Sequence, residues 1–341
     1  MKVLVTGGAG FIGSNFIRHL FASRGEVEVV NFDKLTYAGN VENLADIAGN
    51  RRYSFVYGDI TDPQAVRDAL AKGADAVVNF AAETHVDRSI EDASPFLRTN
   101  VLGTYCLLEA ARKARVPRFV HISTDEVYGS AQAGNSFTEE ATLDPRSPYA
   151  ASKASADHMV SAYSNTFGFP AIVLRCTNNY GPFQFPEKLI PLMIANAIEN
   201  KSLPIYGDGM QERDWLYVED YCRAIALALE KAKPGVVYNV SAGTPQPNLN
   251  IVKTILHHLR KPESLMQFVQ DRPGHDRRYA LDSSKIRREL GWQPEVNFDE
   301  GIRRTIDWYQ TNDEWLDHAR SGEYRKFYER HYMHRAETFK N

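Results

Sequence analysis

A glycine-rich segment near the N-terminus limits the possible folds more than any other feature of the sequence. Gly7-Gly8-Ala9-Gly10-Phe11-Ile12-Gly13 directly follows the apolar run Val3-Leu4-Val5 and opens a helical pattern that extends to Leu20. Glycines at this point permit a tight turn, and they let the backbone approach a pyrophosphate whose charge is met by the amide groups of the helix N-terminus. The segment predicts a dinucleotide-binding β-α-β unit, and a turn of purely structural importance is the alternative.

Short apolar runs then alternate with helical patterns through the first half of the chain. The runs cover residues 3–5, 27–32, 53–57, 76–82, 119–122 and 171–174. Runs of this length and composition are typical of strands buried on both faces of a parallel sheet. Between them, Asp62-Pro63 opens a helix over 64–70 and Ser94-Pro95 opens one over 96–114. The pattern predicts an α/β fold of the doubly wound, Rossmann type.

The regular alternation ends near Tyr180, at the turn-rich stretch 179–186. A later apolar run at 236–240 can add another strand to the sheet, so we expect two interleaved domains. We assign 1–178 with about 210–247 and 288–313 to the dinucleotide-binding Rossmann domain. The smaller α/β substrate-binding domain then takes about 179–209, 248–287 and 314–341. The stretch 323–340 is expected to form a surface helix or ordered tail.

Composition restricts the class of partner. A formal net charge of −3 and 24% charged residues give no electrostatic case for binding nucleic acid or an anionic membrane. Three scattered cysteines favour reduced thiols, and neither a signal-peptide core nor a long apolar stretch is present, so we expect a cytoplasmic protein. The long apolar helices over 96–114 and 149–167 favour a homodimer, although burial within one chain explains them equally well.

Acidic residues at the predicted strand ends suit a nicotinamide dinucleotide. Asp33 ends the second strand, where a carboxylate accepts hydrogen bonds from a ribose and repels a 2′-phosphate, which favours NAD over NADP. Asp59 can accept from an adenine amino group, while Ala81 and Ala82 are small enough for the cofactor to lie flat. A turn or cap role is the alternative for both aspartates.

Two further segments carry the chemistry. Tyr149 and Lys153 lie four apart on one helix face, so the ammonium can lower the pKa of the phenol, and Lys153 can also bind the nicotinamide ribose. Thr124-Asp125-Glu126 ends the fifth strand. Adjacent carboxylates are unfavourable unless one stays protonated, so this pair indicates acid and base chemistry beside the tyrosine. An elimination coupled to internal oxidation and reduction is therefore predicted.

These residues resemble the extended short-chain dehydrogenase/reductase superfamily. Within it, the segment 124–129 is similar to that of the NAD-dependent nucleoside-diphosphate-glucose 4,6-dehydratases, above all those that act on dTDP-glucose, and the similarity covers nearly the whole chain. Segments 35–40, 85–89, 147–153, 187–191 and 271–276 carry it as well. Related epimerases typically have small or hydroxyl residues at the positions of Asp125 and Glu126.

The resemblance implies roles for individual residues. The catalytic group would be Thr124, Asp125, Glu126, Tyr149 and Lys153. NAD would be bound by Gly7, Gly10, Phe11, Ile12, Gly13, Asp33, Lys34, Leu35, Thr36, Asp59, Ile60, Phe80, Ala81, Ala82, Thr84, Thr99, Tyr149, Lys153 and Asn179. The nucleotide sugar would be bound by Thr84, Thr124, Asn178, Lys188, Leu189, Pro204, Ile205, Tyr206, Arg213, Asn248, Arg272 and His275. No metal site is expected, because His331 and His334 lack further ligands at suitable spacing.

The expected reaction is the dehydration of dTDP-glucose to dTDP-4-keto-6-deoxyglucose with NAD retained between turnovers. Tyr149, directly or through Thr124, would take the 4-hydroxyl proton, Glu126 the C5 proton, and Asp125 would protonate the departing 6-hydroxyl. The alternatives are a UDP-glucose 4,6-dehydratase, a nucleotide-sugar 4-epimerase or decarboxylase, and a cofactor-sensing protein without catalysis. The last would be expected to lack Tyr149 or Lys153.

Overall fold

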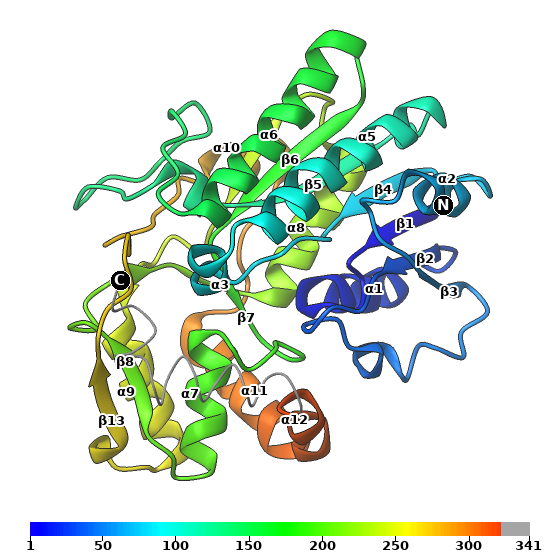
Figure 1. The fold of residues 1–341 in the computed structure, drawn as a ribbon. Helices are drawn as coiled ribbons and strands as arrows, with labels where there is room; N and C mark the ends of the chain where they lie inside the picture. The colour runs from blue at the N-terminus through cyan, green and yellow to red at the C-terminus, as the bar shows by residue number, and fades with distance from the viewer. Residues whose placement is uncertain (322–341) are drawn as a thin grey trace.

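The computed structural model describes residues 1–321 of the chain, and its centre is one parallel sheet (Figure 1). Seven strands follow the order β11-β6-β5-β4-β1-β2-β3. Their bounds are β1 Lys2–Thr6, β2 Glu28–Asp33, β3 Tyr53–Tyr57, β4 Ala76–Asn79, β5 Phe119–Thr124, β6 Ala171–Cys176 and β11 Val237–Val240. The strand order reverses between β1 and β4, which makes the sheet doubly wound and places ligands at the carboxyl ends of these strands. The predicted Rossmann-type fold is confirmed.

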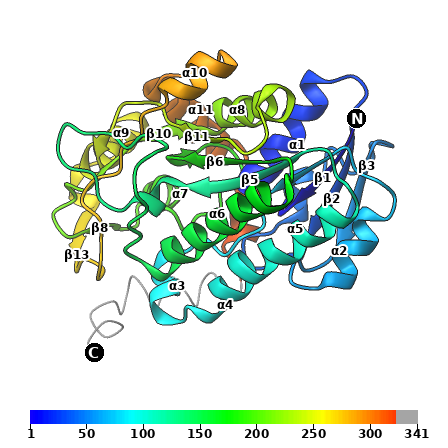
Figure 2. The same cartoon turned by 90° about the horizontal axis from the view of Figure 1, so that it is seen from above.

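Helices cover both faces of the sheet (Figure 2). One face carries α1 (Phe11–Ser23), α8 (Val218–Lys231) and α10 (Ser284–Leu290), and the other carries α2 (Pro63–Leu70), α5 (Thr104–Lys113) and α6 (Pro148–Phe167). Successive side chains of a strand point to opposite faces, so Val3 and Val5 pack with α1 and α8 while Leu4 packs with α2 and α5. Both faces of the central strands are therefore apolar.

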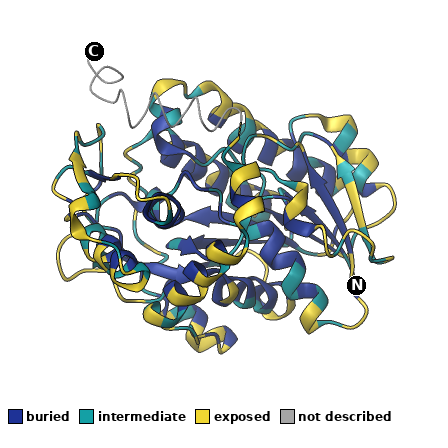
Figure 3. Ribbon diagram, turned by 90° about the horizontal axis from the view of Figure 1, so that it is seen from below, coloured by how far each residue is buried: buried dark blue, intermediate teal, exposed yellow. Residues whose placement is uncertain are grey.

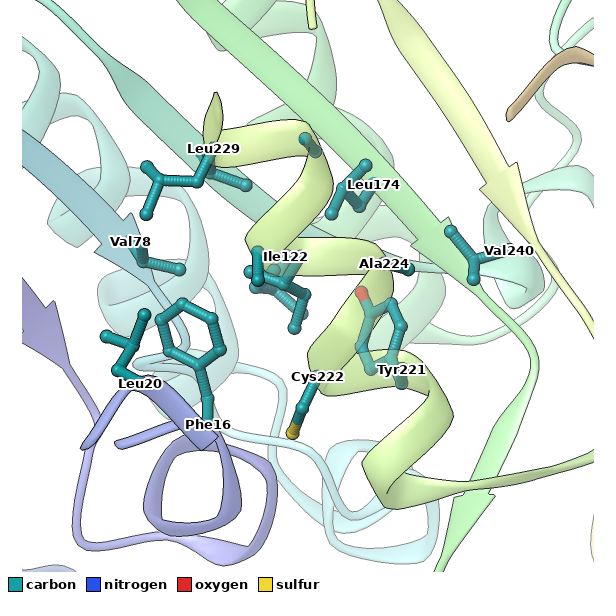
Figure 4. Close-up of a cluster of buried hydrophobic side chains, with 14 of the residues drawn as sticks. Phe16, Leu20, Val78, Ile122, Leu174, Tyr221, Cys222, Ala224, Leu229 and Val240 are labelled. Carbon is teal, nitrogen blue, oxygen red and sulfur yellow. The ribbon is translucent and has the colours of Figure 1, made fainter. Parts of the chain in front are cut away.

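On the face that carries α1 and α8, apolar side chains of both helices and of the strands form one core (Figure 4). Phe16 and Leu20 of α1 meet the side chains of successive strands and of α8 in this cluster. The strand and α8 residues labelled there are Val78, Ile122, Leu174, Val240, Tyr221, Cys222, Ala224 and Leu229. Complete burial of apolar side chains such as these stabilises a fold by about 1.5–3 kcal/mol each.

The strand β3 departs from the expectation of burial on both faces. It pairs only with β2 in the sheet and forms its outer edge, where Tyr57 is 69% exposed and Phe55 is 37% exposed. Figure 3 shows the exposed residues at this edge against the buried central strands. Apolar composition alone does not reveal which strand lies outermost, because that depends on the order of the strands.

The helix expected over 96–114 is interrupted. It is built from α4 (Ser94–Phe96), the π-helix η2 (Leu97–Gly103) and α5. Gly103 lies against Ile60, and a Cβ there would be 2.6 Å from the Ile60 Cδ1 atom. In contrast, α2 begins as predicted, because the Asp62 side chain accepts hydrogen bonds from the Gln64 and Ala65 amides. The remaining elements of this half are α3 (Val86–Glu91) and the 3₁₀ turns η1 (Val41–Leu44) and η3 (Asp125–Tyr128).

A smaller lobe lies beyond the carboxyl ends of the strands. Its elements are β7 Asn178–Tyr180, α7 Leu189–Ile198, β8 Leu203–Tyr206, β9 Glu212–Arg213, β10 Trp215–Tyr217, β12 Gln246–Pro247, α9 Asn248–Leu259, η4 Glu263–Leu265, β13 Met266–Val269, α11 Phe298–Thr311 and α12 Asp313–Ala319. Three two-stranded pairs, β10-β7, β12-β9 and β13-β8, accompany the helices.

The chain crosses between the sheet and the smaller lobe more than once. As predicted from residues 236–240, β11 returns to the sheet and pairs with β6 in parallel. The helix α11, which the sequence placed with the NAD-binding part, packs its Ile302 and Ile306 into the same apolar cluster as α7 and α9. The domain boundaries themselves stay a prediction, and residues 322–341 of the predicted tail, with His331 and His334, lie outside the described part.

Candidate active site

A cavity of about 430 Å³ opens between the carboxyl ends of the strands and the smaller lobe. Every residue that the sequence assigned to catalysis, cofactor or substrate lines it, with the exception of Leu35. Leu35 instead adopts a positive φ of 53° and its amide donates to the Asp33 carboxylate at 2.8 Å. Its contribution is therefore to the conformation of the loop after β2. Segments far apart in the sequence thus converge on one cavity.

The glycine-rich turn is packed so closely against the backbone that Gly7 and Gly13 have no space for a side chain. Gly7 has a φ of +68°, and a Cβ on it would lie 2.7 Å from the Ala81 amide nitrogen. A Cβ on Gly13 would lie 2.4 Å from the Gly7 carbonyl oxygen. The helix α1 begins after Gly10 with no side-chain cap, so its N-terminal amides can meet an anion. The turn therefore fits the diphosphate of a dinucleotide.

Asp33 stands at the end of β2 with only 8% of its surface exposed. Its two carboxylate oxygens accept from the amides of Ala9, at 2.9 Å, and Leu35. Burial raises the pKa of Asp33, and these backbone hydrogen bonds oppose the rise. The Asp59 carboxylate lies 2.6 Å from the Lys34 ammonium. A carboxylate at Asp33 beside the pyrophosphate turn is the arrangement that suits an unphosphorylated adenosine ribose.

Tyr149 and Lys153 both project from the first turns of α6, which the Ser147 side chain caps. The Lys153 Nζ donates to the Ile122 carbonyl at 2.6 Å, and burial lowers its pKa to about 8. Burial also raises the pKa of Tyr149 well above its usual value, and the nearby Glu126 adds to the rise. The sequence predicted a lowered pKa for this phenol. That prediction is wrong for the protein alone, because burial outweighs the opposing hydrogen bond of Thr124.

Thr124 ends β5, and η3 holds the two carboxyl groups that follow it. The Thr124 hydroxyl donates to Asp125 Oδ1 at 3.2 Å, and the Glu126 amide donates to Thr124 Oγ1 at 3.3 Å. Burial and then the charge of Glu126 raise the pKa of Asp125 well above its usual value. Burial raises that of Glu126 too, but Arg272, Lys188 and Arg213 oppose the change. The two carboxyl groups thus have different proton affinities.

The smaller lobe supplies the cations that face these acids. The Arg213 guanidinium donates to the carbonyls of Glu212, at 2.8 Å, and Asp276, at 2.9 Å, and lies 4.1 Å from the centre of the Tyr279 ring. Lys188 donates to the Thr84 carbonyl at 2.7 Å. Two guanidinium groups, that of the buried Arg213 and that of the partly buried Arg272, can bind a nucleotide diphosphate because their planar forks match its oxygens.

The histidine of this cluster is held uncharged. His275 Nδ1 lies 2.6 Å from the Asp271 carboxylate, yet burial and the charges of Arg272 and Arg213 lower the pKa of His275 to about 4. At neutral pH it can take part in a hydrogen bond without adding a positive charge. Within residues 1–321, no group of three or more His, Cys, Asp and Glu side chains is arranged to hold a metal ion.

Asp87 and Tyr279 are among the residues of the cavity wall that sequence reasoning missed. Asp87 accepts from the Tyr206 hydroxyl at 2.9 Å and pairs with Arg272 at 3.4 Å, and Tyr279 lies against Arg213. The first stands in the segment 85–89, which the family resemblance already included. Tyr279 follows the segment 271–276 in the chain, and nothing in its local sequence marks it.

Comparisons with known proteins agree with this geometry. The family model described as GDP-mannose 4,6 dehydratase matches residues 4–305. The chain is 49% identical to dTDP-glucose 4,6-dehydratase 1 of Escherichia coli K12, over 97% of this chain and 99% of that protein. Crystalline DesIV of Streptomyces venezuelae, a dTDP-glucose 4,6-dehydratase with NAD and TYD bound, has a TM-score of 0.91 at 48% identity, covering 94% and 100%.

A second kind of enzyme shares the fold more distantly. The NAD complex of Thermus thermophilus UDP-glucose 4-epimerase has a TM-score of 0.85 at 34% identity, covering 92% of this chain and 100% of that one. With a family model that matches most of its length, and relatives that are about half identical from end to end, the chain belongs to the NAD-dependent nucleotide-sugar dehydratases described as the GDP-mannose 4,6-dehydratase family.

Proposed function

We propose that this protein is a hydro-lyase that converts dTDP-glucose to dTDP-4-keto-6-deoxyglucose with NAD as a retained cofactor. The observation that carries the proposal is the pair Asp125 and Glu126, held beside Tyr149 in one cavity but in unlike surroundings. The names of the relatives at about 49% identity support the same reaction and favour dTDP-glucose over the UDP-glucose alternative. An epimerase has no evident use for such a pair.

NAD would lie along the glycine-rich turn, with its adenosine ribose at Asp33 and its nicotinamide near Tyr149 and Lys153. When bound, it would accept a hydride from C4 and return it to C6, and its positive nicotinamide would favour ionisation of a neighbouring phenol. Tyr149 would take the proton of the 4-hydroxyl, and Thr124, which is near enough to lower the pKa of the phenol, can convey that proton. Lys153 would hold the nicotinamide ribose from below.

The elimination step follows from the different proton affinities of the two acids. Once C4 is a ketone, the C5 proton is acidified, and Glu126 would remove it, because three cations favour its charged form. Asp125, whose pKa burial and the charge of Glu126 raise well above its usual value, would give its proton to the departing 6-hydroxyl. The products are water and an unsaturated ketone, which the returned hydride at C6 and a proton at C5 convert to the 4-keto-6-deoxy sugar.

The substrate's nucleotide would lie in the smaller lobe. Arg213, Arg272 and Lys188 are the proposed contacts of the diphosphate, and Tyr206 offers an aromatic face beside Pro204 and Ile205 for the base. Since thymine and uracil differ by one methyl group, worth about 1–3 kcal/mol in an apolar pocket, we expect a preference instead of an absolute choice.

The experiment that tests the function compares nucleotide sugars. Purified protein is incubated separately with dTDP-glucose, UDP-glucose and GDP-mannose, and the products are identified by mass spectrometry and NMR. We expect loss of water from dTDP-glucose, with solvent deuterium incorporated at C5 when the reaction runs in deuterium oxide. Inversion at C4 without loss of water would indicate an epimerase, and conversion of none of the three would refute the proposal.

We also propose a homodimer that forms through the helical face of η2, α5 and α6. Four large apolar side chains of these elements are exposed: Leu97 is 55% exposed, Leu102 48%, Tyr105 43% and Phe167 53%. Exposed apolar side chains of this size are typical of an interface between proteins. Sedimentation should give a dimer for the wild type and a monomer for Leu97→Asp with Leu102→Asp. The exposed Val41, on η1, provides the control substitution Val41→Asp.

A cytoplasmic location remains a prediction. Its support is that the three cysteines, Cys106, Cys176 and Cys222, are buried free thiols. Among the described helices, none has the length and apolar character needed to cross a bilayer.

A further inference from the structure

A buried carboxylate lies one helical turn beyond the predicted catalytic lysine. Tyr149, Lys153 and Asp157 follow one another at intervals of four along α6, so they share the face that packs on the sheet. Tyr149 and Lys153 line the cavity, but Asp157 does not, and only 1% of its surface is exposed. Asp157 therefore cannot touch a substrate in that cavity.

The contacts of Asp157 come from three elements. Arg175 of β6 donates to Asp157 Oδ2 at 2.8 Å, and the same guanidinium donates to the Tyr128 hydroxyl at 2.7 Å. Asp157 Oδ1 faces His121 Nε2 of β5 across 3.8 Å, and neither of these two atoms has a hydrogen-bond partner among the described residues. One carboxylate oxygen of Asp157, Oδ2, thus binds Arg175, while the other, Oδ1, is unpaired among the described residues.

An arrangement of this kind is not explained by stability. Removing two charges from water costs several kcal/mol per ion, and apolar residues of similar volume often make a fold more stable than a buried ion pair does. An unpaired carboxylate oxygen adds to the cost. The network therefore needs another explanation, and its position directly below Lys153 suggests one.

Lys153 itself is a buried cation whose charge needs support. Its ammonium donates to the Ile122 carbonyl, a neutral acceptor, and burial lowers its pKa to about 8 while the charge of Asp157 opposes that fall. Burial lowers the pKa of His121 well below its usual value and raises that of Cys176 to about 12, so both are neutral near pH 7. The titratable groups that interact with Lys153 are Asp157 on α6, Cys176 on β6 and His121 on β5. Asp125 and Glu126 on η3 act on Tyr149, and Arg175 and Tyr128 are joined to Asp157.

Among the groups that interact directly with Lys153, Asp157 alone supplies a negative charge, since the Cys176 thiol and the His121 imidazole are neutral. We propose that Asp157 is a positioning residue whose carboxylate keeps the Lys153 ammonium charged below Tyr149. It acts on the reaction through Lys153 and touches neither substrate nor cofactor. Its effect on turnover rests on the proposed function, whereas its effect on the ionisation of Tyr149 does not.

The test removes the carboxylate charge alone. In Asp157→Asn the amide oxygen can still accept from Arg175, and the double variant Asp157→Asn with Arg175→Gln, which deletes both charges and spares folding, is measured beside it because loss of the Arg175 cation acts on Lys153 in the opposite direction. Asp157→Glu keeps the charge and serves as the conservative variant. Asp220→Asn is the matched control, because Asp220 is equally buried and paired with Arg223 at 2.7 Å, but it lies on α8, on the opposite face of the sheet from α6 and Lys153.

Two measurements are made on NAD-loaded protein. The first follows the tyrosinate absorbance against pH, with Tyr149→Phe subtracted to isolate the catalytic phenol. The second is the pH profile of kcat/KM. Without the carboxylate, Lys153 loses its proton at lower pH, so the alkaline limb of the profile should move down by about one pH unit and Tyr149 should ionise at higher pH. Asp157→Glu should bring both the alkaline limb of the profile and the pH at which Tyr149 ionises close to those of wild type.

Either of two results would overturn the proposal. One is a folded Asp157→Asn variant with wild-type titration of Tyr149 and a wild-type profile. The other is a loss of activity that is equal at all pH values and matched by Asp220→Asn, which would mark a purely structural role. If the wild-type protein turned over none of the nucleotide sugars, the proposed function would fail, but the tyrosinate titration would still decide the role of Asp157.

Discussion

The hydroxyl of Thr124 donates a 3.2 Å hydrogen bond to Asp125 Oδ1, while Oδ2 of the same carboxyl group has no hydrogen-bond partner among residues 1–321. One oxygen is thus fixed by the end of β5 and the other remains available. A carboxylic acid held in this way presents its proton in one direction. The free oxygen is the one that can protonate a leaving hydroxyl in the cavity.

Asp125→Asn should therefore block the loss of water. The amide preserves the shape of the side chain and can accept from Thr124, but it has no proton to transfer, and removal of general acid catalysis costs about 10²–10⁴-fold in kcat. Product formation is measured by NMR. Exchange of the C5 proton with deuterium oxide should persist, because it depends on Glu126. As a control, Asp144→Asn changes an exposed carboxylate and should turn over at the wild-type rate.

The same substitution should stabilise the protein at neutral pH. The pKa of Asp125 is raised in the folded state, so folded protein binds this proton more tightly than unfolded protein, and stability falls as pH rises through the folded pKa. An Asn at this position has no proton to lose, so the variant does not lose this stability as pH rises. The melting temperature of Asp125→Asn should exceed that of wild type at pH 8, and the difference should vanish near pH 4. A difference independent of pH would mean that the carboxyl group is not the cause.

Glu126→Gln should separate oxidation from elimination. Oxidation at C4 needs Tyr149 and Lys153, which remain, whereas removal of the C5 proton needs a base that Gln does not provide. We expect kcat to fall about 10³-fold, with no deuterium incorporated at C5. Glu139→Gln offers a comparison, because Glu139 accepts from the Asn239 amide and does not line the cavity. Rapid C5 exchange in Glu126→Gln would assign the base to another residue.

Arg213→Ala should weaken binding more than it slows chemistry. Charge-assisted hydrogen bonds contribute about 1.5–3 kcal/mol each, so KM for the nucleotide sugar should rise about 10–100-fold while kcat changes little. Arg213→Lys keeps the charge but loses the planar fork, so its KM should lie between those of wild type and Arg213→Ala. The exposed Arg277, paired with Asp208, gives the control Arg277→Ala. An unchanged KM in Arg213→Ala would remove Arg213 from the substrate site.

Tyr37→Phe should speed the release of NAD. The Tyr37 hydroxyl donates to Glu187 at 3.1 Å, which ties the loop after β2 to the segment before α7, and Thr36, Gly39 and Glu187 all line the cavity. Loss of one partner leaves Glu187 buried without that donor and costs about 1–3 kcal/mol. The NAD content after extended dialysis, measured by absorbance of the denatured supernatant, should drop below that of wild type. Tyr57→Phe, at the exposed sheet edge, should retain NAD as wild type does.

The sequence could predict what depends on local spacing. The glycine-rich turn, the cap at Asp62 and the pair Tyr149 and Lys153 are each defined within a few residues, and the fold built from them is the one observed. The site assignments were then extended by family resemblance, and the cavity gathers all of them except Leu35. Their roles await the substitutions above.

What the sequence could not predict depends on contacts between distant segments. The exposure of β3 follows from strand order, and the partnership of Asp87 with Arg272 joins residues 185 apart. The raised pKa of Tyr149 is of the same kind, since the spacing to Lys153 indicated an attractive charge but could not indicate the burial that outweighs it. In all three cases the surroundings of the residue depend on the tertiary structure and not on its neighbours in the sequence.

The position of β11 has a consequence for the synthesis of the chain. The strand that completes the sheet beside β6 ends at Val240, after β7 to β10 and the helices α7 and α8 have already been translated. During synthesis on the ribosome, the edge of β6 that later pairs with β11 therefore stays unpaired while part of the smaller lobe emerges. A premature stop after Cys176 would leave that edge, and the apolar faces next to it, to aggregation or to chaperones.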